Sequence, residues 1–219
     1  MRTVFVAGAG TDIGKTFVAC ALIRALRAQG LSVDALKPAV SGLDLASMQD
    51  SDSGRLLDAL GRPLTPETLD AISPLRFSAP LAPPAAARRE GRTLTLDMLL
   101  EPCRARQAGP DVDLLLVEGA GGVMSPIAEG ATNLDLISAL GAPVLLVGGS
   151  YLGAISHGLT ALETLKTRGC EVLGLAVSES LDAPDLGETV EELRRFAAGT
   201  PVAAVPRGGG VEPLLAWLL

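Results

Sequence analysis

Residues 3–18, with the sequence TVFVAGAGTDIGKTFV, decide the fold of this chain. They begin with a β-branched apolar run that is typical of a buried strand, and a glycine-rich turn follows. Gly14, Lys15 and Thr16 then lead into a helical pattern of apolar residues. The order strand, loop, helix predicts a phosphate loop, because backbone N–H groups, the lysine charge and the threonine hydroxyl suit a triphosphate with Mg²⁺.

The loop departs from the strict pattern G-x-x-x-x-G-K-[ST] at its first position. Ala9 stands there, and Gly8 comes one residue earlier, so the loop is one residue longer than the usual form. A glycine-rich turn can also serve only to pack a helix against a strand. Gly-Lys-Thr between a strand and a helix favours nucleotide binding over that simpler interpretation.

The composition predicts an α/β protein with a single domain over residues 1–219. Hydrophobic residues make up 48% of the chain and aromatic residues only 3%, which suits close packing of helices on a sheet. Strand and helix patterns alternate, which predicts a mostly parallel central sheet with helices on both faces, of the phosphate-loop NTPase type. The net charge of −7 argues against a nucleic-acid partner, since that needs a basic face.

The cysteines and the N-terminus predict a cytoplasmic protein. Cys20, Cys103 and Cys170 are isolated and odd in number, as expected for free thiols in a reducing compartment. A strand begins almost at once, and no apolar run approaches the length of a membrane span. We therefore expect neither a membrane nor a targeting segment.

Further strands and helices are expected along the rest of the chain. The first helix should end near Gln29, before Gly30. The expected strands cover 31–36, 113–118, 143–147, 171–177 and 202–205. The expected helices cover 53–60, 66–71, 84–90, 96–107, 132–140, 154–167, 186–197 and 211–219. Residues 43–50 read as a polar loop, and the proline-rich segment 62–94 reads as an insertion or lid around the site rather than a linker.

Charged side chains follow two of these strands. Pro38 keeps Lys37 extended at the carboxyl end of one strand, the edge where ligands bind in open α/β sheets. Glu118 ends another, beside a glycine-rich turn, where an acidic residue supports Mg²⁺ in phosphate-loop enzymes. Asp52 taken alone is more simply explained as a helix cap than as a metal ligand. His157, in the first turn of a helix, is expected to be structural.

Several motifs resemble the dethiobiotin synthetase family in order and spacing. The long phosphate loop is also this family's form. The motifs are Lys37-Pro38-x-x-Ser41-Gly42, Asp52, Val117-Glu118-Gly119-Ala120-Gly121-Gly122, Phe77, Pro80, Pro83, Glu90-Gly91 and Leu152-Gly153-x-Ile155-x-His157. The resemblance covers nearly the whole chain.

The resemblance implies a ligase of biotin biosynthesis that acts as a homodimer. Such an enzyme carboxylates 7,8-diaminopelargonate with CO₂, phosphorylates the carbamate from ATP and closes the ureido ring of dethiobiotin. By the same resemblance, the catalytic residues are Thr11, Lys15, Lys37 and Ser41, and the Mg²⁺ ligands are Thr16, Asp52 and Glu118. The implied nucleotide-binding residues are Asp12, Ile13, Gly14, Lys15, Thr16, Phe17, Glu118, Ser178, Pro206 and Gly208. The implied substrate-binding residues are Lys37, Ser41, Gly121, Gly122, Gly153, Ala154 and Ile155.

One departure concerns the nucleotide base. In the resembled family an Asn-Asp pair reads the adenine edge, and Ser178-Glu179 stand at the matching positions here. A serine hydroxyl lacks the paired donor and acceptor of an asparagine amide. We therefore expect relaxed selectivity for the base.

Three alternatives share the predicted nucleotide site. A partitioning-type ATPase uses nucleotide as a switch, but it carries a signature lysine where Gly10 stands in this chain. Another ATP-dependent ligase of the same superfamily would normally add a glutaminase domain, for which this chain has no room. In a protein that only binds nucleotide and catalyses no reaction, Lys37 and Ser41 would have no role at a strand end beside the phosphates.

Overall fold

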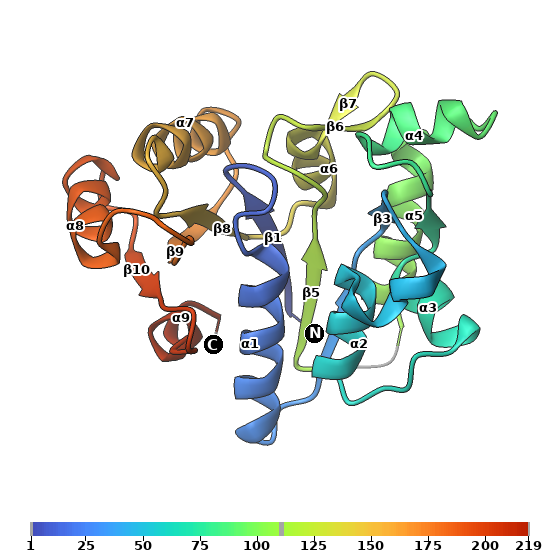
Figure 1. Ribbon diagram of the computed structural model, residues 1–219, viewed down its shortest axis with the longest axis horizontal. Helices are drawn as coiled ribbons and strands as arrows, with labels where there is room; N and C mark the ends of the chain where they lie inside the picture. The colour runs from blue at the N-terminus through green and yellow to red at the C-terminus, as the bar shows by residue number, and fades with distance from the viewer. Residues whose placement is uncertain (1, 110–111, 219) are drawn as a thin grey trace.

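The computed structural model describes residues 2–109 and 112–218. Within them, six parallel strands form a central sheet in the order β10-β9-β8-β1-β5-β2 (Figure 1). These strands are β1 (Arg2–Gly8), β2 (Val33–Leu36), β5 (Leu114–Glu118), β8 (Val144–Gly149), β9 (Val172–Ser178) and β10 (Val202–Val205). The predicted parallel α/β sheet is confirmed.

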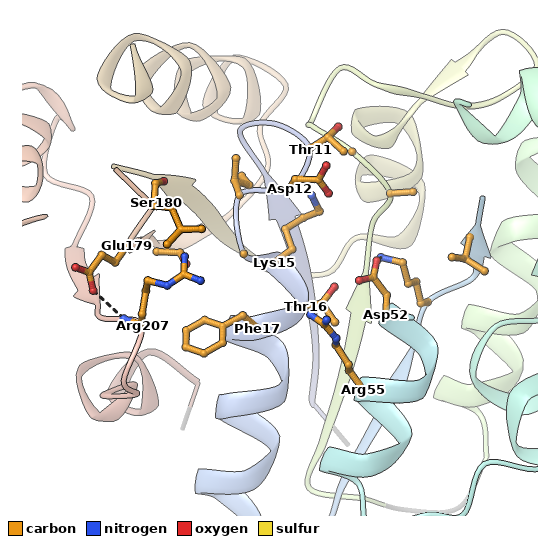
Figure 2. Close-up of a pocket in the computed structure, with 18 of the residues that line it drawn as sticks. Thr11, Asp12, Lys15, Thr16, Phe17, Asp52, Arg55, Glu179, Ser180 and Arg207 are labelled. Carbon is orange, nitrogen blue, oxygen red and sulfur yellow. Dashed lines mark hydrogen bonds and ion pairs between the residues drawn. The ribbon is translucent and has the colours of Figure 1, made fainter. Parts of the chain in front are cut away.

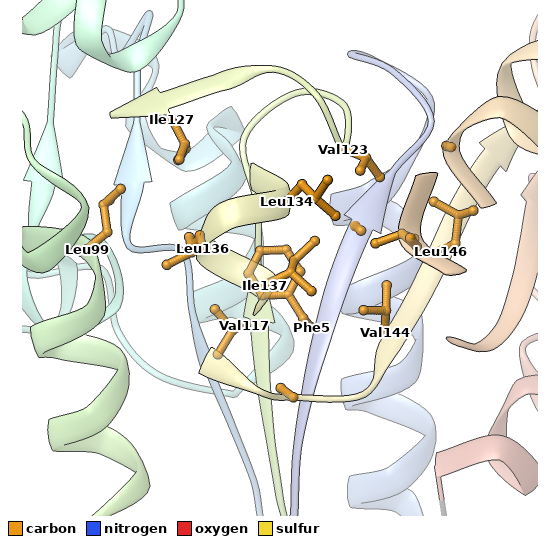
Figure 3. Packing of buried hydrophobic residues seen from close by; sticks show 14 of the residues in the cluster. Phe5, Leu99, Val117, Val123, Ile127, Leu134, Leu136, Ile137, Val144 and Leu146 are labelled. Carbon is orange, nitrogen blue, oxygen red and sulfur yellow. The ribbon is translucent and has the colours of Figure 1, made fainter. Parts of the chain in front are cut away.

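Helices cover both faces of this sheet, because successive strand residues point to opposite sides. Phe5 and Ala7 of β1 belong to one core, while Val4 and Val6 belong to the other. The helices on the Phe5 side are α4 (Pro83–Arg89), α5 (Leu96–Gln107), α6 (Asn133–Leu140), α7 (Ala154–Thr167) and α8 (Leu186–Phe196). Those on the Val4 side are α1 (Lys15–Ala28), α2 (Asp52–Ala59), α3 (Pro66–Ile72) and α9 (Glu212–Leu218). Figure 3 shows Phe5 beside Ile137 of α6 in the first core.

The predicted helices are confirmed within the described residues, with small shifts at their ends. Residue 219, the last of the predicted helix 211–219, lies outside the described residues. Helix α1 begins after Gly14 and ends before Gly30, and both glycines have positive φ angles, 94° and 84°. Helix α7 covers the predicted range. None of the helices in the described residues has the length and apolar character needed to cross a bilayer.

Short elements are the main difference from the sequence prediction. The predicted loop 43–50 contains a 3₁₀ helix, η1 (Leu45–Asp50), formed by bonds between residues three apart. Four short strands were also not predicted, since two or three residues are too few to show a periodicity. They are β3 (Ala39–Val40), β4 (Leu75–Arg76), β6 (Pro126–Ala128) and β7 (Ala131–Thr132).

The proline-rich segment 62–94 packs against the chain that follows β2. The backbone N–H of Lys37 donates to the carbonyl of Ile72 at 2.8 Å, and strands β3 and β4 pair in parallel. The N–H of Gly42 donates to the carbonyl of Ala79 at 3.0 Å. The segment therefore supports the residues that carry Lys37 and Ser41.

Candidate active site

A cavity of about 650 Å³ opens at the carboxyl edge of the sheet, around the loop between β1 and α1 (Figure 2). Val6 pairs with Glu118 and Leu36 pairs with Val117, so the register brings Lys37 next to Glu118. The structure brings most of the predicted residues to the cavity wall. Those lining it are Thr11, Asp12, Ile13, Gly14, Lys15, Thr16, Phe17, Lys37, Ser41, Asp52, Gly121 and Ser178.

The cavity has two ends. We call one the inner end; it is lined by Lys15, Thr16, Lys37, Asp52 and Arg55, and the buried carboxylate of Glu118 binds Thr16 and Lys37 from behind this wall. We call the other the outer end; it is made by Phe17, Ser178, Glu179, Ser180, Leu181 and Arg207. In Figure 2 Asp52 and Arg55 lie on one side of the start of α1, and Glu179, Ser180 and Arg207 lie on the other.

Lys37 is at the centre of the inner end. Its Nζ lies 2.5 Å from Oε1 of Glu118 and 2.9 Å from Oδ2 of Asp52. Lys37 and Glu118 are both fully buried, with exposed fractions of 3% and 2%. Burial alone lowers the pKa of Lys37, but the two carboxylates outweigh burial and raise it above the ordinary value. Lys37 therefore keeps its positive charge.

Oxygen atoms that could bind a metal ion surround this lysine. The hydroxyl of Thr16 donates to Oε1 of Glu118 at 2.6 Å. The second oxygen of Glu118, Oε2, is buried and has no hydrogen-bond partner among the described residues. Burial alone raises the pKa of Asp52, but Lys37 outweighs it and the net pKa is lowered. Asp52 therefore stays ionised and can act as an anionic ligand.

Asp52 does not cap its helix. Ser51 is the N-cap of α2, and its hydroxyl accepts a hydrogen bond from the N–H of Gly54 at 3.1 Å. The capping interpretation of Asp52 is therefore wrong. Its carboxylate is instead directed to Lys37.

Lys15 is the second buried cation of the inner end. Its Nζ donates to the carbonyl of Gly10 at 2.8 Å. Burial, helped by the neighbouring charge of Lys37, lowers the pKa of Lys15 to about 8. A Cβ on Gly8 would lie 2.7 Å from Cδ of Lys15, so only glycine leaves room for this side chain. Of the three lysines in the chain, two lie here and the third is Lys166.

The outer end is more open. Ser178 is buried, and a Cβ on Gly14 would lie 2.3 Å from its hydroxyl oxygen. The exposed fractions of Phe17 and Leu181 are 37% and 69%. The backbone N–H of Arg207 donates to the carboxylate of Glu179 at 2.9 Å. This end therefore offers exposed apolar and charged groups around one buried hydroxyl.

Comparison with known proteins gives the family. A family model described as an AAA domain matches residues 2–213. The ATP-dependent dethiobiotin synthetase of Phenylobacterium zucineum is 60% identical over 211 residues, which cover 95% of this chain and 90% of that protein. The enzyme of the same name from Caulobacter vibrioides is 58% identical over 209 residues, covering 95% and 94% of the two chains. This chain belongs to the dethiobiotin synthetase family. The resemblance stated from the motifs is thereby confirmed, and with it an ATP-dependent ligase.

Solved structures confirm the fold alone. The MinD cell division protein of Aquifex aeolicus matches with a TM-score of 0.56 and 12% identity, over 100% of this chain and 86% of that one. A ParA family ATPase from Chlorobium tepidum matches with a TM-score of 0.54 and 15% identity, over 99% and 88%. Membership of the dethiobiotin synthetase family decides against the partitioning-type alternative.

Some residues implied by the family resemblance do not line this cavity. Glu118 is one of them, because its buried carboxylate is covered by Lys37 and Thr16, to which it is bound. Gly122 lines a second cavity of about 440 Å³, together with His157 and Met124. Gly153, Ala154 and Ile155, where α7 begins, are outside the wall of the first cavity, as are Pro206 and Gly208 on either side of Arg207. His157 pairs with Tyr151, whose hydroxyl lies 2.8 Å from Nδ1, in keeping with a structural role.

Sequence reasoning did not single out several residues of this site, among them Asn133, Arg55 and Arg207. The side-chain amide of Asn133 donates to the carbonyls of Ala120 and Gly122, at 2.7 and 2.8 Å, and so fixes the turn after β5. Arg55 and Arg207 line the cavity itself. No motif marks these residues, because each reaches the site only through the packing of its element; the position of Arg55 three residues after Asp52 was the one available signal.

Proposed function

We propose that this chain forms the ureido ring of dethiobiotin from 7,8-diaminopelargonate, CO₂ and ATP, and acts as one domain over residues 1–219. Besides membership of the family, one observation supports the proposal. The inner end gathers the ammonium groups of Lys15 and Lys37 in a single cavity. A carbamate and a triphosphate are both anionic, so their meeting requires such cations.

The reaction proceeds in three steps. One amine of the diamine attacks CO₂ and loses a proton to give a carbamate. A carbamate oxygen attacks the terminal phosphorus of ATP, and ADP leaves. The second amine then attacks the carbonyl carbon of the mixed anhydride, loses a proton and expels phosphate, which closes the ring.

The chain's own residues hold and orient these reactants. Lys15 binds the phosphates together with the N–H groups of the loop. Lys37, whose pKa is raised by Glu118 and Asp52, stays protonated and stabilises charge on the carbamate and the transferring phosphoryl group. Thr11 and Ser41, which line the same cavity, supply hydroxyls that hydrogen-bond the reactants without adding charge.

Thr16, Asp52 and Glu118 fit Mg²⁺. The unpartnered buried oxygen of Glu118 supports this assignment. The described residues contain no group of three or more His, Cys, Asp and Glu side chains placed to hold a metal. Two carboxylates with a hydroxyl suit Mg²⁺, which takes few protein ligands and shares the phosphate oxygens of its substrate. When bound, Mg²⁺ neutralises developing charge on those oxygens.

The nucleotide and the diamine would contact largely different residues. The proposed nucleotide contacts are Asp12, Ile13, Gly14, Phe17, Ser178, Pro206 and Gly208. The proposed diamine contacts, besides Lys37 and Ser41, are Gly121, Gly122, Gly153, Ala154 and Ile155. The start of α7 suits the carboxylate of the substrate, because free N–H groups there attract anions.

We also propose a homodimer in the cytoplasm. Two exposed large apolar side chains support the dimer: Met124, which lines the second cavity, is 57% exposed, and Leu152, just before α7, is 91% exposed. Buried free thiols support a reducing compartment: burial raises the pKa of Cys20 and of Cys103 to about 12, which keeps both unreactive. A monomer with full activity in light scattering would contradict the dimer.

Turnover with the natural reactants tests the function. Purified protein is incubated with Mg²⁺, ATP, bicarbonate and 7,8-diaminopelargonate, and phosphate and dethiobiotin are measured by colorimetry and mass spectrometry. We expect phosphate release that depends on the diamine and equals dethiobiotin formed. Phosphate release without that dependence would contradict the synthetase function.

A further inference from the structure

Arg55 is a third cation at the inner end of the cavity. It lies on α2, three residues after Asp52, so the two side chains share one face of the helix. Both line the cavity, together with Thr16. In Figure 2 the Arg55 side chain extends from α2 toward Thr16.

The carboxylates nearest to Arg55 on its own helix are already paired. Asp52 binds Lys37 at 2.9 Å, and Asp58 binds Arg24 at 2.7 Å. The guanidinium of Arg55 makes no hydrogen bond or ion pair with the residues that the structure describes, although the chain is acidic overall. Its exposed charge is therefore directed to the cavity without a protein partner.

The other charges of the inner end provide too little net positive charge to balance a triphosphate. Lys37 is offset by two carboxylates, Glu118 and Asp52. Lys15 then remains as the other cation there, against a triphosphate with up to four negative charges. A guanidinium is always charged and presents a planar fork of N–H donors that matches phosphate oxygens.

We propose that Arg55 binds a phosphate oxygen of the nucleotide, from the wall opposite the loop that carries Lys15. Helix α2 thus contributes an anion and a cation one turn apart. Asp52 faces Lys37 and the metal ligands, and Arg55 faces the phosphates. This inference rests on the proposed use of ATP, and it adds a nucleotide-binding residue that neither the motifs nor the family resemblance assigns.

Calorimetric titration with Mg²⁺-ATP and Mg²⁺-ADP tests the proposal. We expect Arg55→Ala to raise Kd about tenfold, as for the loss of one hydrogen bond to a charged group. Arg55→Lys should recover part of the affinity, because it keeps the charge and loses the fork. Arg89→Ala, which removes an exposed arginine of α4 away from the cavity, is the matched control and should bind like the unchanged protein.

Two further readouts separate the possible failures. The ligand-free melting temperature of Arg55→Ala should equal that of the unchanged protein; a drop that Arg55→Lys does not restore would mean that Arg55 only supports α2, and would overturn the proposal. Equal Kd values for Arg55→Ala and the unchanged protein would overturn it too. If the unchanged protein binds nucleotide and Arg55→Ala binds it tenfold less tightly, but no diamine-dependent phosphate release occurs, only the synthetase function fails. A protein that binds no nucleotide would overturn both.

Discussion

The two ends of the cavity are built differently. At the inner end, Lys37 and Glu118 are almost completely buried and bind each other, and Thr16 donates to the same carboxylate. At the outer end, Leu181 and Arg207 are exposed, and Ser178 is the one buried polar side chain among the residues that define it. A buried network of charged and polar groups is held in one geometry, because a buried group that loses its partner costs several kcal/mol of stability, roughly. Exposed side chains can instead change conformation and bind water. The contrast suggests an enzyme that is strict about phosphates and tolerant about the base.

The largest effect should follow Lys37→Ala. It removes the charge beside the reacting groups and leaves the Glu118 carboxylate buried without its partner. We expect turnover to fall at least about 100-fold, and the free energy of unfolding to fall by about 3–5 kcal/mol. Steady-state kinetics and denaturant unfolding measure both. Lys166→Ala, at a half-buried lysine bound to backbone carbonyls, is the matched control. Comparable activity in both variants would contradict the role of Lys37.

Lys15→Ala should act mainly on nucleotide affinity. The variant loses the ammonium group that lies beside the glycine-rich loop. We expect Kd for Mg²⁺-ATP to rise about 100-fold, the upper range for a hydrogen bond between charged groups. Calorimetry gives the value. Nucleotide binding that survives this change intact would refute the phosphate loop.

The lowered pKa of Lys15 predicts a pH dependence confined to the inner end. In the free protein this lysine is charged below about pH 8 and loses its proton above that value. Phosphates favour the charged form, so affinity for ATP should fall as the pH rises past 8, by up to about tenfold per pH unit. Titrations from pH 7 to 9.5 measure the fall. The Lys15→Ala variant is the control, and an equal slope in that variant would assign the effect to another group.

The smallest effect concerns the outer end. Because Ser178 supplies a single hydroxyl, we expect kcat/KM for ATP, CTP and GTP to agree within about tenfold. Parallel turnover assays with the three nucleotides provide the comparison. A strict preference for ATP would remove the contrast between the two ends.

The inner end was largely predictable from local patterns. A phosphate loop is contiguous, and Lys37 and Glu118 each close a buried strand, so sequence alone places them at one edge of a parallel sheet. Asp52 was harder, because an acidic residue at the start of a helix is usually explained as a cap, and only the structure shows that Ser51 caps α2 instead. The packing of α2 directs Asp52 to Lys37, and Ser51 is left to cap the helix.

The outer end was less accessible to sequence reasoning. Ser178 was found through the family resemblance, whereas Leu181 and Arg207 follow β9 and β10 in loops without a motif. Loop residues meet a cavity according to how distant elements pack, and no local periodicity encodes that. The same holds for Arg55, whose role depends on where α2 lies against α1.

The sequence by itself determined the parallel α/β class, the phosphate loop and the ends of most helices, because these depend on interactions between residues near each other in the chain. Tertiary structure alone decided that Lys37 binds both Asp52 and Glu118 and that Arg55 lines the same cavity. These contacts join segments up to 81 residues apart, and their geometry is set by strand register and helix packing.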